Sequence, residues 1–305
     1  MGEIRKLSPT LAVTGCVVAA LFWGGMYVVA KDALNVISAN YMLTIRFSIA
    51  FVIMIIIYAK YIKGITKEVI KGCLITGSFM AAGYASLTVG LQYINAGNCA
   101  FITDTYVIWI PFILWIIWKV KPEGPHVFIA AALTLVGISL LTLQGGLNLQ
   151  FGDAITLFGA FCWAGELITI DIYAKKIQPQ LLVTFQTLTV AIITLILALI
   201  TSEPVPTLTV LTEPKLMLQF LYLIVLATFV ANSLQNYCQR FITATQASVI
   251  FPMESVFAVV FGVIFLGEIV NGLSAIGMVL LFSAILMSNL GGRLFGKKNS
   301  DQIEV

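Results

Sequence analysis

The stretch LLVTFQTLTVAIITLILALI, residues 181–200, decides the fold class of this 305-residue chain. It contains no charged residue over a length close to the roughly 20 residues that a helix needs to cross a bilayer. It also lacks the strict polar–apolar alternation of a transmembrane β-strand. The stretch therefore predicts a membrane-spanning α-helix.

The whole chain, like this stretch, is rich in hydrophobic residues and poor in charged ones. Hydrophobic residues make up 60% and charged residues 10%, whereas soluble domains carry about 25% charged residues. So few charges do not cover a water-exposed surface, which predicts an all-α integral membrane protein with the lipid bilayer as its partner. A net charge of +3 gives no reason to expect a nucleic-acid partner.

Charged residues, Pro/Gly clusters and polar turns divide the chain into ten candidate spans. They cover residues 11–31, 39–59, 70–91, 97–118, 125–144, 152–173, 180–201, 216–238, 244–266 and 272–290. The first apolar stretch is too long for a signal peptide and has no small-residue cleavage site, so we expect it to be retained as a span.

The distribution of Lys and Arg predicts the orientation. Fourteen lie on the side of the N-terminus, only Lys31 and Lys215 lie on the other side, and Arg46 falls within the second span. This asymmetry predicts a multi-pass protein of the cell (cytoplasmic) membrane with both termini in the cytoplasm.

The two halves of the sequence resemble each other. FWGG at residues 22–25 matches CWAG at 162–165, and Thr44-Ile45-Arg46 matches Thr184-Phe185-Gln186 at the same offset of 140 residues. Because five spans per copy is an odd number, the second copy must enter the membrane in the opposite direction, as in many secondary transporters. We predict two inverted five-helix repeats, residues 11–144 and 152–290, followed by a cytoplasmic tail, 291–305.

Several motifs together carry a family resemblance. They are LFWG at 21–24 followed by Lys31, IRF at 45–47, AGNCAFIT at 96–103, and ESVF at 254–257 running to LGE at 266–268. In their order and spacing, nearly the whole chain resembles the drug/metabolite transporter superfamily, specifically its EamA-type members. Two departures are Ser255, where the family often has proline, and Trp118-Lys119-Val120, which replaces the Leu-Gly-Glu of the first copy.

The resemblance implies a bundle of ten helices around a central cavity. Spans one, three, four, six, eight and nine are expected to line that cavity. Members of this kind are secondary carriers of amino acids, metabolites or amphipathic compounds, and many of them are exporters.

Ionisable residues inside a membrane are costly, so each is a candidate functional residue. Arg46 and Asp104 lie at matching depths, about 10 Å into their spans at 1.5 Å per residue. We predict a structural ion pair between them if spans two and four are neighbours, with outward snorkelling of Arg46 as the alternative. Asp171 is expected to pair with Lys175 at i,i+4.

Two glutamates are the best candidates for contact with a substrate or a proton. Glu254 lies near the midplane of the ninth span. Glu166 has Met26 as its counterpart in the first repeat, so this carboxylate breaks the repeat symmetry. The alternative is that each glutamate forms hydrogen bonds that hold helices together.

Neighbouring aromatic and polar residues complete the predicted site. Trp23, Trp163 and Tyr106 are candidates to attract an organic cation through their rings, and Asn98 is a candidate hydrogen-bonding residue. Asp104 is a candidate binding residue as well as a partner for Arg46. Packing between helices explains most of these residues almost as well. Pro111 and Pro252 are predicted to interrupt spans four and nine, which correspond across the repeat, and bent helices in matching positions mark a transporter's site and gate.

We expect a secondary active transporter that moves a small organic solute, such as an amino acid, metabolite or amine, by alternating access. The alternative is an intramembrane enzyme acting on a lipid-like substrate, although no catalytic constellation is visible. The five cysteines and His126 have no metal-ligand spacing, so neither a metal nor a cofactor is expected. We expect a monomer or a homodimer.

Overall fold

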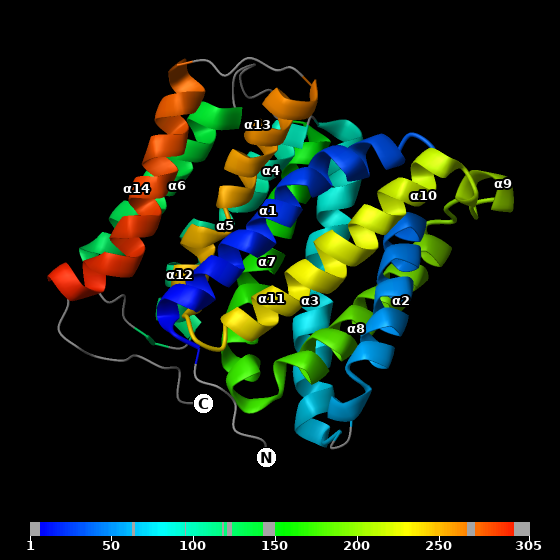
Figure 1. Cartoon of the computed structure of the whole chain (residues 1–305), viewed down its shortest axis with the longest axis horizontal. Helices are drawn as coiled ribbons and strands as arrows, with labels where there is room; N and C mark the ends of the chain where they lie inside the picture. Colours follow the sequence, from blue (N-terminus) through cyan, green and yellow to red (C-terminus); the bar gives the residue numbers. More distant parts are fainter. Residues whose placement is uncertain are drawn as a thin grey trace.

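The computed structural model describes residues 7–62, 65–94, 96–117, 119–120, 124–142, 150–266 and 272–295. Within these ranges the chain is helical and contains no strand (Figure 1). The elements up to residue 142 are α1 (Pro9–Ala33), α2 (Ala39–Ile57), the short 3-10 helix η1 (Ala59–Tyr61), α3 (Lys67–Tyr93), α4 (Ala96–Asp104), α5 (Tyr106–Ile117) and α6 (Pro125–Thr142). From residue 150 they are α7 (Phe151–Lys176), α8 (Pro179–Ile200), α9 (Leu208–Leu211), α10 (Pro214–Leu221), the π-helix η2 (Tyr222–Val230), α11 (Ala231–Cys238), α12 (Ala244–Ile250), α13 (Met253–Leu266) and α14 (Gly272–Phe295).

Many of these helices are suited to a membrane. Seven described segments are long and apolar enough to cross a bilayer: Pro9–Ala33, Ala39–Ile57, Lys67–Tyr93, Cys99–Ile117, Phe151–Lys176, Pro179–Ile200 and Pro214–Cys238. Two shorter apolar helices are Pro125–Leu140 and Ala275–Ala284. The chain is a helical, multi-pass membrane protein.

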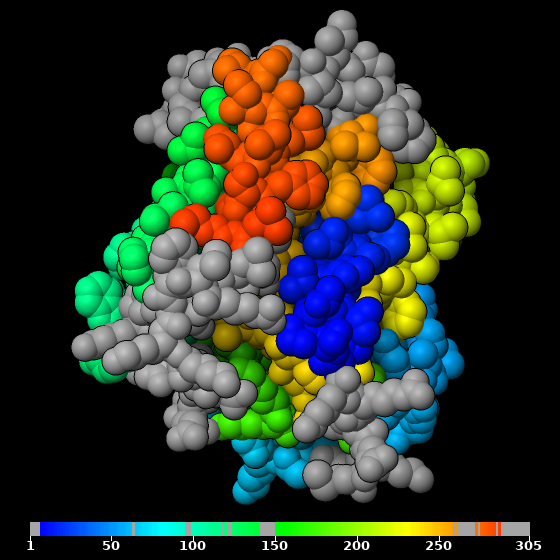
Figure 2. All heavy atoms as spheres, turned by 60° about the vertical axis from the view of Figure 1, so that its left-hand side comes forward, coloured from blue at the N-terminus to red at the C-terminus, as the bar shows by residue number. Residues whose placement is uncertain are grey.

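The outward face of α14 shows how the surface meets lipid. Leu273, Ile276, Val279, Phe282 and Leu286 recur every three or four residues, and each exposes more than half of its surface. Figure 2 shows α14, in orange and red, at the molecular surface. An apolar stripe at helical spacing is costly in water but favourable against acyl chains.

Helices from the two ends of the chain pack against each other. α1 packs between α13 and α11, α2 packs on α8, α3 on α7 and α8, and α6 on α14 (Figure 1). At Gly24 the contact between α1 and α13 is so close that a Cβ atom would lie 2.7 Å from the carbonyl oxygen of Glu254. The absence of a side chain at Gly24 therefore brings α1 to the start of α13.

Two of the predicted spans are broken. The fourth is interrupted at Thr105, whose hydroxyl donates a hydrogen bond to the carbonyl of Ile102 at 2.6 Å. Pro111 lies inside the uninterrupted α5, so the prediction that it interrupts the span is wrong. The helix breaks at Thr105 instead, because its hydroxyl bonds a backbone carbonyl of the preceding turn and so competes with the helical hydrogen bonds there. The ninth span is interrupted at Phe251–Pro252, as predicted, between α12 and α13.

The predicted eighth span contains a π-helix. α10, η2 and α11 follow one another without a gap, and the middle nine residues are π-helical. The hydroxyl of Thr228 donates to the carbonyl of Leu223, five residues earlier, at 2.7 Å. At the other end of the chain α14 continues to Phe295, and residues 296–305 lie outside the described part.

Candidate substrate site

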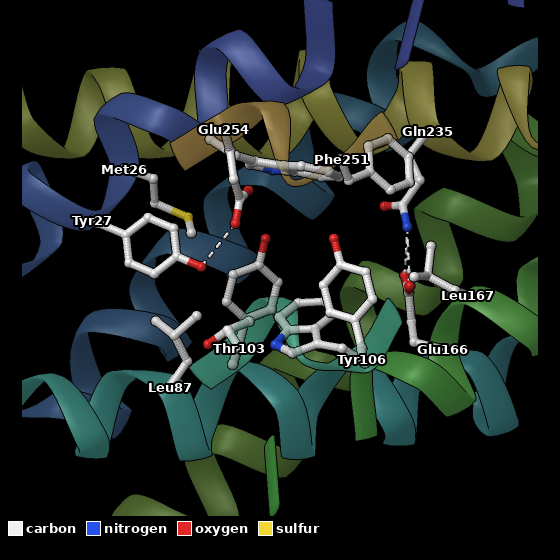
Figure 3. A pocket seen from close by; sticks show the side chains of 13 residues that line it. Met26, Tyr27, Leu87, Thr103, Tyr106, Glu166, Leu167, Gln235, Phe251 and Glu254 are labelled. Carbon is white, nitrogen blue, oxygen red and sulfur yellow. Dashed lines mark hydrogen bonds between the residues drawn. The ribbon is translucent and has the colours of Figure 1, made fainter. Parts of the chain in front are cut away.

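A pocket lies where the broken helices meet α1, α3, α7 and α11. Its lining consists of Trp23, Met26, Tyr27, Tyr84, Leu87, Thr103, Tyr106, Trp163, Glu166, Leu167, Gln235, Phe251 and Glu254. These residues come from the predicted spans one, three, four, six, eight and nine, which are the segments that the family resemblance implied. Figure 3 shows Glu254 and Glu166 at opposite ends of the pocket.

Glu254 forms one end of the pocket. It is the second residue of α13, and a carboxylate in the first turn of a helix is favoured by the helix dipole. The hydroxyl of Tyr27 on α1 donates a hydrogen bond to Glu254 Oε1 at 2.9 Å (Figure 3). The break before α13 and the close approach at Gly24 together place this carboxylate beside α1.

Glu166 forms the other end, within a network of amides. Gln186 Nε2 donates to Glu166 Oε1 at 3.0 Å, and Gln235 Nε2 donates to both carboxylate oxygens at 3.2 and 2.9 Å. Asn236 Nδ2 donates in turn to Gln186 Oε1 at 3.2 Å. Neutral donors from α8 and α11 thus hold this fully buried carboxylate in place.

Aromatic rings form much of the wall between the two ends. Trp23 packs edge-on against Phe251, with 5.1 Å between ring centroids, and Tyr84 packs edge-on against Trp163 at 4.7 Å. Trp23 Nε1 donates to the carbonyl of Ala227 in η2 at 3.0 Å, whereas Trp163 Nε1 has no acceptor in the described part of the chain.

Two polar side chains come from the broken fourth span. Thr103 Oγ1, at the end of α4, is buried and has no partner within hydrogen-bond distance among the described residues. In Figure 3 the hydroxyl of Tyr106 points from the start of α5 into the pocket. The break at Thr105 therefore places polar groups from both of its sides at the pocket.

Asp104 lies just behind the pocket, between the two broken helices. Ser255 Oγ of α13 donates to Asp104 Oδ2 at 2.9 Å, while Asp104 Oδ1 has no partner within hydrogen-bond distance among the described residues. Asp104 is the last residue of α4 and is fully buried. Serine at position 255 makes this contact possible, because the proline common in the family has no hydroxyl.

The predicted Arg46–Asp104 ion pair is wrong. Arg46 Nε donates to Thr228 Oγ1 at 2.6 Å, and Nη2 donates to Met26 Sδ at 3.2 Å and to the carbonyl of Ala227 at 3.3 Å. The guanidinium also lies 4.9 Å from the ring centre of Tyr84. The reason is that α2 packs on α8, η2 and α3, which turns Arg46 toward the π-helix. Nor does Arg46 snorkel outward, since it is 1% exposed.

The remaining predicted residues divide as follows. Lys175 Nζ lies 2.6 Å from Asp171 Oδ1, which confirms that pair, and Asp171 Oδ2 also accepts from the backbone N–H of Ala244. The side chain of Asn98 lies outside the described part. Pro111 and Pro252 do not line the pocket.

Sequence reasoning missed Tyr27 and Gln186. Tyr27 gave no signal of its own, because it is one apolar-compatible residue in a long apolar span. Gln186 did give one, since it is the repeat counterpart of Arg46 and therefore falls at a depth where polar residues are costly.

Comparison with known proteins agrees with this architecture. The profile of the EamA-like transporter family matches residues 10–143 and 150–290. An uncharacterized transporter of Archaeoglobus fulgidus (strain ATCC 49558) is 32% identical over 290 residues, covering 95% of this chain and 89% of that protein. The uncharacterized transporter YyaM of Bacillus subtilis (strain 168) is 26% identical over 200 residues, covering 61% of this chain and 64% of that protein. The chain belongs to the EamA-like transporter family and is a membrane transporter.

A solved crystal structure has the same fold. It superposes with a TM-score of 0.77 at 15% sequence identity, covering 95% of this chain and all of the other. In the described part of the present chain, no group of three or more His, Cys, Asp or Glu side chains is arranged to hold a metal ion.

Proposed function

We propose that the chain is a secondary active transporter that moves a small organic solute, such as an amino acid, metabolite or amine, across the cell membrane by alternating access. The observation that carries the proposal is the pocket between Glu254 and Glu166, which helices from both family-matched stretches line. Two broken helices meet beside it, and broken helices at a repeat interface are typical of transporter sites.

The proposal includes ten spans in two inverted five-helix repeats, residues 11–144 and 152–290. Packing between helices supports it, because the pairs α2–α8 and α6–α14 join equivalent spans of the two halves. The contact of α1 with α13 likewise has its counterpart in the contact of α7 with α4 and α5. Such an arrangement allows one half to rock against the other around a fixed central site.

The orientation belongs to the same proposal. The fourteen Lys and Arg residues on the side of the N-terminus support cytoplasmic termini in the cell membrane. An intramembrane enzyme is the second candidate, and it requires turnover of a lipid-like substrate without solute movement.

The test is solute counterflow in vesicles reconstituted with the purified full-length protein. We expect uptake of a labelled solute into vesicles preloaded with the unlabelled solute, and loss of this uptake in Glu254→Gln and Glu166→Gln. Glu68→Gln is the matched control, since Glu68 is exposed in the first turn of α3. Absence of counterflow for every solute that stabilises the protein, or turnover of a lipid, would contradict the proposal.

A further inference from the structure

We infer that the solute is an organic cation with an apolar body, with its ammonium group beside Glu254 and its body between the aromatic rings of the pocket. The inference rests on the proposed transport function and adds the chemical class of the substrate. Three features of the pocket support it: the charges of its lining, the polar atoms that have no protein hydrogen-bond partner, and the aromatic side chains of its walls.

The charges of the pocket are unbalanced. Two lining residues, Glu166 and Glu254, are acidic, and none of the described lining residues is basic. The protein donors to these carboxylates, Tyr27, Gln186 and Gln235, are all neutral. A buried carboxylate without a counter-cation is costly, and a cationic ligand removes that cost.

Arg46 does not supply the missing charge. Its guanidinium lies behind the pocket wall, against Met26 and Tyr84, and its hydrogen bonds go to Met26, Thr228 and the carbonyl of Ala227. None of these bonds involves Glu166 or Glu254. No cation of the described lining balances the two carboxylates, so we assign the balancing charge to the solute.

The two carboxylates differ in what they offer to a ligand. Both oxygens of Glu166 already accept hydrogen bonds from amides. Glu254 accepts one hydrogen bond, from Tyr27 to Oε1, and its Oε2 accepts none from the described protein. An ammonium group carries three donors, so Glu254 is the residue that contacts it, while Glu166 contributes a fixed negative charge at the other end.

The walls fit the rest of such a solute. Trp23, Tyr84, Trp163 and Phe251 present aromatic surface, and ring faces attract cations most strongly where water is excluded. Thr103 Oγ1 is buried, lines the pocket and has no protein partner, so it is available to accept an N–H of the solute. Trp163 Nε1 also lacks a partner, but as a neutral donor it does not balance a solute carboxylate placed near two glutamates.

The test uses four probes that share a phenyl group and differ in charge: 2-phenylethylammonium, 2-phenylethanol, phenylalanine and 3-phenylpropanoate. Binding to the purified full-length protein is measured as the concentration dependence of thermal stabilisation, because a ligand that binds only the folded state raises stability by mass action. We expect the ammonium compound to bind at least roughly tenfold more tightly than the other three probes.

Substitutions at Glu254, Tyr27 and Glu166, with Glu68→Gln as the control, identify the residue responsible. Glu254→Gln should remove the preference for the ammonium compound, whereas Tyr27→Phe should keep it, because the charge remains and Oε1 becomes free. Glu68→Gln, on the exposed start of α3, should behave like the wild type. If Glu254→Gln does not fold, persistence of the preference in Tyr27→Phe, together with its weakening in Glu166→Gln, still supports the inference.

Equal or tighter binding of phenylalanine, phenylethanol or phenylpropanoate would overturn the cation inference, as would an unchanged preference in folded Glu254→Gln or no stabilisation by the ammonium compound. Counterflow of a neutral or zwitterionic solute would then leave the transport function standing. Selective binding of the ammonium compound without counterflow of any solute would support the cation site and count against the carrier.

Discussion

Gln186 Nε2 donates a hydrogen bond to Glu166 Oε1 at 3.0 Å, across 20 residues of sequence. The other half of the chain has the equivalent contact, in which Arg46 Nη2 donates to Met26 Sδ at 3.2 Å, also across 20 residues. The same pair of positions is thus in contact in both halves. The ionisable side chain is the donor, Arg46, in the first half and the acceptor, Glu166, in the second. In each half this contact joins one buried ionisable side chain to a neutral partner.

Replacing Gln186 with leucine should destabilise the protein. Glu166 would lose one donor and Asn236 would lose its acceptor at Gln186 Oε1, and buried groups left unpaired cost about 1–3 kcal/mol. Chemical unfolding in detergent measures the loss. Gln178→Leu is the control, because Gln178 is exposed and its side chain makes no capping hydrogen bond. Equal stability of the two variants would contradict the prediction.

Arg46 should be coupled energetically to Thr228 and not to Asp104. A double-mutant cycle of Arg46→Gln with Thr228→Val should give a coupling energy within the range of about 0.5–3 kcal/mol, since the two side chains are hydrogen bonded. The cycle of Arg46→Gln with Asp104→Asn should be additive within about 0.5 kcal/mol. A larger coupling in the second cycle than in the first would show that the two charges interact after all.

Ser255 should link the two broken helices through Asp104. Ser255→Ala removes the hydroxyl that lies 2.9 Å from Asp104 Oδ2, so we expect a loss of about 1–3 kcal/mol in the free energy of unfolding and slower transport. Ser255→Thr keeps the hydroxyl and should recover part of both. Ser248→Ala is the control, because the hydroxyl of Ser248 bonds only locally, to the carbonyl of Thr245. If Ser255→Ala lowers stability and transport no more than Ser248→Ala does, Ser255 does not link the two broken helices.

The two membrane prolines should differ in their effect on transport. Pro252 lies in the break between α12 and α13, so Pro252→Ala favours a continuous helix and should slow counterflow. Pro111 lies within the continuous α5, so Pro111→Ala should leave transport nearly unchanged and leave stability equal or higher. Initial rates of counterflow, compared at equal amounts of folded protein, measure the difference. A greater loss in Pro111→Ala would reverse this assignment.

The helical membrane fold could be predicted because its signal is repeated and local. Long apolar stretches such as residues 181–200 require helices in lipid, whatever their neighbours are. The segments that line the pocket followed from the family resemblance. The i,i+4 pair Asp171–Lys175 was predictable for the same local reason, since both residues lie on one helix face.

The errors concern features that packing decides. The partner of Arg46 depends on which helix lies beside α2, and equal depth in the bilayer does not determine which helices are neighbours. The π-helix η2 carries no proline or glycine to mark it, and its side-chain contacts come from α1 and α2. The break at Thr105 was not predicted, because proline is the stronger helix-breaking signal and the break was assigned to Pro111.

The carbonyl oxygen of Ala227 accepts hydrogen bonds from Trp23 and from Arg46. Trp23, which lines the pocket, and the buried guanidinium of Arg46 are therefore hydrogen bonded to the same backbone atom of the π-helix. Trp23 cannot change its rotamer without breaking its hydrogen bond to that helix. A change in the shape of the pocket at Trp23 is therefore coupled to a change in the backbone of the eighth span.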